Sequence, residues 1–454
     1  MKNVFTSAIL TFFFLLSAAG HSQTVQEVLG FSNALSSYEG EVTLAQGRDG
    51  RLYGTTEGSP STTNPDGTIF RVDTDGTAAT ALFSLSGTNG QGPVFGLTLG
   101  TDGNYYGSTL QGGVSNFGVL FKVSPTGNYT VLYRFTGGSD GGIPVGAPIQ
   151  GSDGNFYGTT INGAIYKYVP STSTFSTVLT LNSFQGARIS APLIQASDGS
   201  LYGTATMGGT SNCGSIFRVS TTGALISVHY FPCGLGGNFP TAPLYEASDG
   251  NLYGTTLQGG NGAGTIFRLS KGIVSVIHSF SGLPNDAGNP VGGLVQGTDG
   301  NLYGATEWGG TSGIGTLYQI TTSGQYKLLY NFVDSIGMSP LASLLQDTNG
   351  KFYGTASAGG PNSYGAIYSL DMGLGPFIAL VHYTGGVGHS VQILGQGLLG
   401  STAVTINGIA ATSFKVVSDH YMTAVVPSGA TTGPVVVTTP TGTLTSNQNF
   451  RIMQ

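Results

Sequence analysis

The feature that most constrains the fold is a short phrase that recurs along the chain about every fifty residues. The phrase reads SDGNLYGTT at residues 248–256, and related versions begin at Arg48, Ser152 and Thr298. Its tyrosine marks seven copies, at Tyr53, Tyr106, Tyr157, Tyr202, Tyr253, Tyr303 and Tyr353. A period of this length is typical of proteins that are built from repeated supersecondary units. The chain therefore contains seven similar units in similar surroundings.

Each unit divides into four short strands. In the fifth copy the predicted strands are 242–247, 252–256, 265–269 and 273–280. Asp249-Gly250 supplies the positive φ angles that a tight hairpin turn needs, and no segment has the 3.6-residue apolar period of a helix. A lone four-stranded sheet exposes two apolar faces, whereas radial stacking buries them. The sequence thus predicts an all-β fold with a seven-bladed β-propeller; a β-helix would need a much shorter repeat.

The recurring phrase is interpreted as structural, because an enzyme site occurs once in a chain and this phrase occurs seven times. Its acidic position is predicted to form turns and is occupied by Asp49, Asp102, Asp153, Asp198, Asp249, Asp299 and Asn349. An amide or acid also recurs on the first strand, as Gln46, Gln150, Gln195, Glu246, Gln296 and Gln346. We expect these side chains to form hydrogen bonds between neighbouring units.

The two ends of the chain differ from the repeats. An apolar run at residues 8–16 follows Lys2 and precedes small residues, which predicts a signal peptide over residues 1–22. Residues 25–31 resemble the fourth strand of a repeat, so we expect them to pair with residues 366–370 and close the ring; residues 378–383 are the alternative for that place. The expected domains are the signal peptide, a propeller over 23–373 and a β-sandwich over 374–454.

Cys213 and Cys233 are the two cysteines of the chain. Gly223, in the predicted hairpin turn of the fourth repeat, lies midway between them, so they should face each other across the open end of that hairpin. In an oxidising compartment this arrangement predicts a disulfide. Two buried free thiols are the alternative.

Beyond about Leu374 the repeat phrase stops, and short strands rich in Val and Thr are predicted, which indicates a small β-sandwich. The stretches SVQILGQGL and VTINGIAATSFKVVSDHYMTAVVPSGATTGPVVVTTPTG resemble an IPT/TIG immunoglobulin-like domain over residues 375–452. The repeat, typified by PLYEASDGNLYGTTLQGGNGAGTIFRLS, resembles the GloVer tandem repeats of exported bacterial proteins over residues 40–372. Neither resemblance implies a defined reaction.

Composition and motifs exclude several classes of function. The net charge is −6 with no run of basic residues, which excludes nucleic-acid binding. The match to G-x-S-x-G at residues 137–141 lies in a predicted loop and is expected by chance. Residues 73–76 lack the further ligands of a calcium loop, and the histidines are dispersed. We predict no catalytic residue, no metal and no cofactor.

The leading hypothesis is a recognition or scaffold protein that is secreted, periplasmic or on the cell surface. We expect it to be monomeric and to have no transmembrane segment after signal cleavage. Its expected partner is a glycan or a cell-surface protein. Loops on a rigid scaffold are where recognition tends to lie. The candidates are residues that break the repeat in the loops: Trp308, Glu307, Glu57, Arg188 and Asp140. An exposed Trp308 would stack on a sugar ring; alternatively, it covers its own blade. The rivals are an extracellular polysaccharide hydrolase or lyase, for which hydrolysis usually needs two flanking carboxylates, and a purely structural envelope protein.

Overall fold

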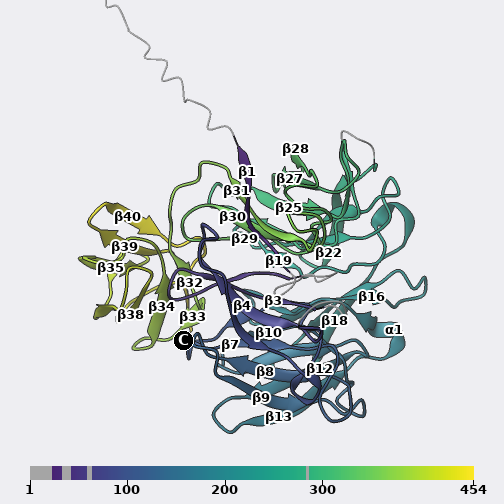
Figure 1. Cartoon of the computed structure of the whole chain (residues 1–454). Helices are drawn as coiled ribbons and strands as arrows, with labels where there is room; N and C mark the ends of the chain where they lie inside the picture. Colours follow the sequence, from purple (N-terminus) through teal and green to yellow (C-terminus); the bar gives the residue numbers. More distant parts are fainter. Residues whose placement is uncertain (1–22, 33–41, 59–63, 283–285, 454) are drawn as a thin grey trace, which may run out of the picture.

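The computed structural model describes residues 23–32, 42–58, 64–282 and 286–453. The predicted signal peptide lies outside the described residues. The described chain consists of short β-strands joined by turns, with a single α-helix of four residues, α1 (Ser183–Gly186), in the described part (Figure 1). The prediction of an all-β fold is confirmed.

In the described residues the repeats form seven antiparallel sheets, here called repeat sheets one to seven. Repeat sheet one contains β2 (Ala45–Gln46), β3 (Leu52–Thr56), β4 (Thr68–Val72) and β5 (Thr80–Ser84). Repeat sheet two contains β6 (Thr98–Leu99), β7 (Tyr105–Ser108), β8 (Val119–Val123) and β9 (Tyr129–Arg134). Repeat sheet three contains β10 (Pro144–Gln150), β11 (Phe156–Thr160), β12 (Ala164–Val169) and β13 (Thr174–Thr180). Repeat sheet four contains β14 (Ala187–Ile189), β15 (Ile194–Gln195), β16 (Leu201–Met207), β17 (Ser215–Val219) and β18 (Leu225–Tyr230).

The remaining repeat sheets follow the same order of strands. Repeat sheet five contains β19 (Tyr245–Glu246), β20 (Leu252–Thr256), β21 (Thr265–Ser270) and β22 (Ile273–Ser279). Repeat sheet six contains β24 (Val295–Gln296), β25 (Leu302–Thr306), β27 (Thr316–Ile320) and β28 (Tyr326–Asn331). Repeat sheet seven contains β29 (Leu345–Gln346), β30 (Phe352–Ala356), β31 (Ala366–Asp371) and β1 (Thr24–Gly30).

The recurring phrase has the structural role that its repetition indicated. In the first six copies the carboxylate of the turn aspartate accepts a hydrogen bond from the tyrosine hydroxyl four residues later, at 2.6–2.9 Å. In the seventh copy the bond is reversed, because the amide of Asn349 donates to the hydroxyl of Tyr353 at 2.9 Å. The hydrogen bond within each copy of the phrase therefore links the first hairpin turn of a sheet to the second strand of the same sheet.

The recurring Gln or Glu of the first strand joins neighbouring sheets, as predicted. Its side-chain oxygen accepts a hydrogen bond from a backbone N–H in the turn of the preceding sheet. The pairs are Thr348 to Gln46, Thr101 to Gln150, Ser152 to Gln195, Ser197 to Glu246, Ser248 to Gln296 and Thr298 to Gln346. Since Gln46 belongs to sheet one and Thr348 to sheet seven, the same kind of hydrogen bond also joins the first and the last repeat sheet.

The N-terminal strand completes repeat sheet seven. β1 pairs antiparallel with β31, with Val25 opposite Leu370 and Gly30 opposite Ala366. Figure 1 shows the purple β1 beside the green β31. The predicted pairing of the N-terminal segment is confirmed, and the alternative is wrong, because β32 (Ala379–Leu380) pairs with β34 (Ser390–Leu394) instead. Because β1 pairs with β31, the edge of β31 is covered.

The C-terminal residues form three small sheets, here called the C-terminal sheets, drawn in yellow-green in Figure 1. The first contains β32, β34, β38 (Tyr421–Val425) and β37 (Phe414–Val416). The second contains β36 (Ile409–Ala410), β35 (Ala403–Ile406), β39 (Val435–Thr439) and β40 (Gly442–Thr445). The third pairs β33 (Thr384–Gly385) with β41 (Arg451–Ile452). They share one apolar core, which includes Ile393, Met422, Val435, Val437 and Phe450.

Candidate binding site

The two ends of the repeat sheets differ in what covers them. The turns that follow the first strands contact the C-terminal sheets, as the bonds below show. At the other end, the segment between two sheets pairs with the loop between the second and third strands of the following sheet. This pairing recurs at Gln91 with Gln111, Asn238 with Gln258, Met338 with Ala358, and β23 (Ala287–Gly288) with β26 (Trp308–Gly309). The predicted grouping of the variable loops at one end is confirmed; we call it the open end.

The first contact with the C-terminal sheets involves Arg48. Its guanidinium donates hydrogen bonds to the carbonyl of Thr101 at 2.7 Å and to Oε1 of Gln392 at 2.8 Å, and it lies over the ring of Tyr421. Sister positions of Arg48 carry Ser or Thr, and Leu99 occupies the position that other sheets give to Gln or Glu. Arg48 therefore replaces the missing link between sheets one and two and also holds the C-terminal sheets.

A second contact centres on Glu246, the one acid in the glutamine series. Its carboxylate accepts hydrogen bonds from the backbone N–H of Ser197 and from Nη2 of Arg451, the latter at 2.9 Å. The neighbouring Tyr245 hydroxyl accepts a hydrogen bond from Gln448 at 3.3 Å, and burial raises the pKa of Tyr245. The carboxylate that replaces an amide in sheet five thus gains an ion pair with β41.

The third contact contains a buried carboxyl group. Asp347 is fully buried at a position where the other repeats carry Gly or Ala. Burial raises the pKa of Asp347 to about 7, although the backbone N–H of Asn349 and the amide of Gln396 donate hydrogen bonds to Oδ1. Gln396 belongs to the C-terminal part of the chain. Asp347, like Arg48 and Glu246, is therefore a departure from the repeat that meets the C-terminal sheets.

A cavity of about 280 Å³ remains between these contacts. Its apolar lining includes Leu99, Ile149 and Ile194 from the first strands of sheets two to four, and Leu244, which directly precedes the first strand of sheet five. Its polar rim includes Glu246, His382 and Arg451. The ring of His382 contacts the carbonyl of Gly151 through Nε2 at 3.0 Å. Since Glu246 and Arg451 neutralise each other and His382 bonds to backbone, these groups hold the C-terminal sheets in place, and we assign them no chemistry.

At the open end Trp308 is partly exposed, with 45% of its surface accessible. Its six-membered ring lies beside glycine backbone, because a Cβ built on Gly288 or Gly282 would lie 3.6 or 3.9 Å from it. The adjacent Glu307 turns toward the segment between the sheets and accepts a hydrogen bond from the amide of Asn289. The glycines leave room for the indole to rest against the loop while part of the ring faces solvent.

The other predicted site residues lie apart from Trp308. Glu57 is half-buried after β3 of sheet one. Arg188 is exposed in β14 of sheet four and has a positive φ of 59°. None of the hydrogen bonds or ion pairs between described residues joins these two side chains to Trp308 or to Glu307. The structure therefore places them around the open end without assembling them into one cluster.

The side chain of Asp140 stabilises the loop to which it belongs. Its carboxylate is buried and accepts hydrogen bonds from the backbone N–H of Thr136 at 2.7 Å, from the hydroxyl of Tyr133 at 3.0 Å and from the backbone N–H of Gly142 at 3.2 Å. Burial alone would raise the pKa of Asp140, but these hydrogen bonds outweigh it and lower the pKa. Because its oxygens are occupied, we leave Asp140 out of the surface proposed below.

Sequence reasoning missed a set of apolar side chains that share the open end with Trp308. They are exposed in the loops and segments between sheets: Val114, Phe184, Leu235 and Val333. Each interrupts a stretch rich in Gly, Ser or Asn, which is the signal that could have identified it. An exposed apolar side chain in an otherwise polar loop indicates an interaction surface when several occur on one face.

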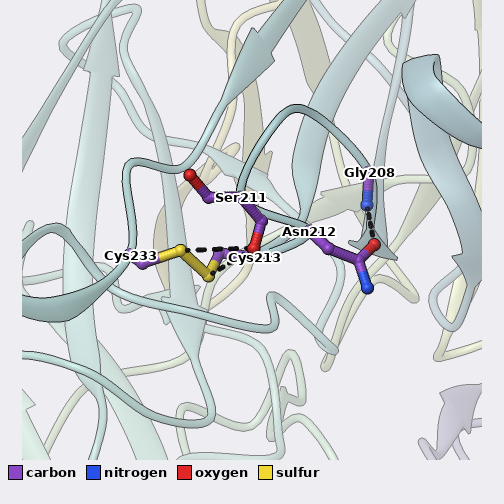
Figure 2. Close-up of a disulfide and its surroundings, with 5 residues drawn as sticks. All are labelled: Gly208, Ser211, Asn212, Cys213 and Cys233. Carbon is purple, nitrogen blue, oxygen red and sulfur yellow. Dashed lines mark hydrogen bonds between the residues drawn. A yellow bond between two sulfur atoms is a disulfide. The ribbon is translucent and has the colours of Figure 1, made fainter.

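The predicted disulfide between Cys213 and Cys233 is present (Figure 2). Cys213 directly precedes β17 and Cys233 follows β18. The disulfide therefore joins the two ends of the β17–β18 hairpin in repeat sheet four. Both sulfur atoms lie near the carbonyl of Ser211. The alternative of two free thiols is wrong.

Two further classes of site were sought in the described ranges. No group of three or more His, Cys, Asp or Glu side chains there is arranged to hold a metal ion. No helix in the described part of the chain is long and apolar enough to cross a membrane.

The fold and these surfaces define a class: an all-β protein of tandem fifty-residue repeats, with further sheets packed against one end and variable loops at the other. The chain belongs to the Gloeobacter/Verrucomicrobia repeat family, whose model matches residues 11–164, 138–285 and 261–396. The predicted membership in a GloVer-type repeat family is thereby confirmed. No curated protein matches this chain in sequence.

Two solved structures from B. thetaiotaomicron share the fold. The extracellular domain of BT4673, described as a hybrid two-component system, is 13% identical with a TM-score of 0.54 over 92% of this chain and 46% of that domain. The extracellular domain of BT3049, also described as a hybrid two-component system, is 14% identical with a TM-score of 0.51 over 95% of this chain and 54% of that domain. The chain thus spans about half the length of each structure, and the likeness is one of fold alone.

Proposed function

We propose that this chain is an extracellular recognition protein that binds a glycan through its open end. In this proposal residues 23–373 form a seven-bladed β-propeller after removal of a signal peptide, and residues 374–454 form an IPT/TIG-like sandwich that caps the opposite end. The observation that carries the proposal is Trp308, which is 45% exposed at a loop position where sister repeats carry Gln111, Met207 and Gln258.

The chemistry of the open end suits a sugar. An aromatic ring with one part exposed can stack on the apolar face of a pyranose, and a nearby carboxylate can accept bonds from its hydroxyls. Glu307 supplies that carboxylate beside Trp308, although it also bonds to Asn289. The exposed apolar residues around the same end widen the surface.

An extracellular location is supported by the disulfide of repeat sheet four, because such bonds persist in oxidising compartments. The structures that share the fold are described as extracellular domains, which agrees with this location. The rival enzyme and the purely structural protein remain as outcomes of the test.

The test is retention of the purified protein on a panel of immobilised bacterial and plant polysaccharides. Trp308→Ala should lower the affinity for a bound glycan about ten-fold, since loss of aromatic stacking costs about 1.5 kcal/mol, and it should leave the melting temperature nearly unchanged. Gln258→Ala, at the same position of sheet five, is the matched control and should bind normally. Unaltered binding by Trp308→Ala would contradict the proposal, as would release of reducing ends from the glycans, which favours an enzyme.

A further inference from the structure

The interface between repeat sheets four and five contains a cavity of about 370 Å³. It is lined by Val228 and His229 of β18, by Arg218 of β17, and by Lys271 and Gly272 of the turn before β22. It lies away from Trp308, at the end where the turns of the third strands are found. We call this cavity the 4–5 cleft.

One cause of the 4–5 cleft is a displaced β-bulge. In six of the seven described repeat sheets the outer strand bulges just after it passes the aromatic residue of the third strand, as opposite the step between Ile69 and Phe70. In sheet four the irregularity lies two residues further along the third strand, between Arg218 and Val219. A bulge redirects the local backbone, so the outer strand of sheet four presents a different edge to sheet five.

The second cause is a shorter turn in sheet five. Five residues separate the paired Val219 and Leu225 in sheet four, whereas only four separate the paired Leu269 and Val274 in sheet five. In four sister turns, a Cβ built on the turn glycine would lie 1.8–2.9 Å from a carbonyl oxygen in the outer strand of the preceding sheet; these are Gly76, Gly127, Gly223 and Gly324. A Cβ on Gly272 would meet nothing within 4 Å. The turn of sheet five therefore does not reach sheet four, and a space remains.

Three sister interfaces contain a pair of stacked rings near this place. The pairs and their centroid distances are Phe83 on Tyr129 at 4.2 Å, Tyr133 on Phe175 at 3.6 Å and His278 on Tyr326 at 4.1 Å, all within 6° of parallel. In each, a ring late in one outer strand meets a ring at the start of the next outer strand.

Repeat sheet five lacks the second ring of such a pair. His229 pairs with Ile216 as His278 pairs with Ile266, so the two imidazoles are counterparts. Val274 pairs with Leu269 as Tyr326 pairs with Ile320, so the valine stands where a sister sheet has a tyrosine. Among the described residues the ring contact of His229 is with Phe231, which meets it edge-on at 5.9 Å. One face of the imidazole is therefore left for another ring.

The charges around the 4–5 cleft favour an anion. Nη2 of Arg218 and Oδ2 of Asp198 are 2.8 Å apart, so these two groups neutralise each other. Lys271 is exposed and forms no ion pair with any described residue. Burial lowers the pKa of His229, which keeps its imidazole neutral at neutral pH. The cleft therefore carries one unbalanced positive charge beside a neutral aromatic face.

We propose that the 4–5 cleft binds a small planar aromatic carboxylate. The ring of the ligand stacks on His229 in the place that sister interfaces fill with Tyr or Phe, and its carboxylate pairs with Lys271. Aromatic stacking and a charge-assisted hydrogen bond together give orientation as well as affinity. The volume suits a molecule of one ring. This site is independent of the glycan surface at the open end.

The first experiment titrates 4-hydroxybenzoate into the purified protein by calorimetry. Two comparison compounds separate the two interactions: 4-hydroxybenzamide lacks the charge, and cyclohexanecarboxylate lacks the aromatic ring. Each should bind about ten-fold more weakly than 4-hydroxybenzoate. An absence of 4-hydroxybenzoate binding at millimolar concentration would overturn the proposal, as would equal affinity for all three compounds.

The second experiment uses variants of the cleft. Val274→Tyr supplies the ring that sheet five lacks and should abolish binding while raising the melting temperature. Lys271→Gln should weaken 4-hydroxybenzoate about ten-fold and leave 4-hydroxybenzamide unchanged; Lys327→Gln, an exposed lysine of β28, is the control and should bind as the parent does. Full binding by a folded Val274→Tyr, or equal losses in the two lysine variants, refutes the site. If Val274→Tyr does not fold, the two lysine variants still decide.

Discussion

Asp347 offers the sharpest test of how the C-terminal sheets dock, because it is an ionisable group in a fully buried contact. Burial raises its pKa to about 7, whereas an unfolded aspartate titrates near 4. Asp347 is therefore more protonated in the folded protein than in the unfolded chain between about pH 4 and 7. For a carboxyl with a raised pKa, the contribution to the free energy of unfolding is highest below this range and falls as the pH rises through it.

The size of this effect follows from the difference in pKa. About three pKa units correspond to about 4 kcal/mol of lost stability above pH 7, of which about 3 kcal/mol is lost between pH 5 and 8. Asp347→Asn removes the ionisation and keeps a carbonyl oxygen for the hydrogen bonds from Asn349 and Gln396. The second oxygen of Asp347, Oδ2, has no hydrogen-bond partner among the described residues, so replacing it costs no described bond.

Urea unfolding of the parent and of Asp347→Asn at pH 5, 6, 7 and 8 measures the difference directly. The variant should gain stability relative to the parent as the pH rises, by an amount approaching 3 kcal/mol across the series. The difference between the two curves cancels the titration of all other groups that the proteins share. The stability difference between variant and parent could instead stay constant from pH 5 to 8, or fall as the pH rises. Either result would show that ionisation of Asp347 does not destabilise this contact.

Two further changes test the repeat sheets. Cys213→Ser breaks the disulfide and should lower the free energy of unfolding by about 3 kcal/mol for a loop of this length. Denaturant unfolding measures this loss. The reduced parent protein is the control and should lose the same amount. Gly76→Ala and Gly272→Ala have φ angles of 80° and 81° and should share a backbone cost of about 1 kcal/mol. Gly76→Ala should lose about 2 kcal/mol more, because its Cβ meets the outer strand of sheet seven, and equal losses in calorimetric melting would contradict the packing described.

Much of the repeat could be predicted from the sequence, because its determinants are local. Asp249-Gly250 fixes a turn, and Tyr253 bonds to the same aspartate four residues away. The strand pairing within each sheet follows from these turns. The first strand is shorter than predicted: residues 242–247 were expected to be extended, yet only Tyr245–Glu246 form a ladder with β20.

The docking of the C-terminal sheets could not be predicted, because it depends on residues far apart in the sequence. Arg48 and Gln392 are separated by 344 positions, and Glu246 and Arg451 by 205. Asp140 was misleading for a related reason: a solitary acid in a loop looks exposed, but here the loop folds around it. The exposure of Trp308 likewise depends on how glycine-rich segments pack, which the sequence does not state.

Residues that depart from the repeat nevertheless fall into two groups once the sheets are aligned: those with a compensating partner and those without one. Leu99 and Arg48 depart together, and the arginine makes the link that the leucine lacks, so this pair preserves the contact between sheets one and two. Glu246 departs alone on the repeat, but its partner is Arg451 of the C-terminal sheets. Val274 stands where three sister sheets have a stacked ring, and no described residue supplies a ring opposite His229. A compensated departure preserves the fold, whereas an uncompensated one leaves an unfilled place, and that difference is why we assign a ligand to the 4–5 cleft and none to the cavity beside Glu246.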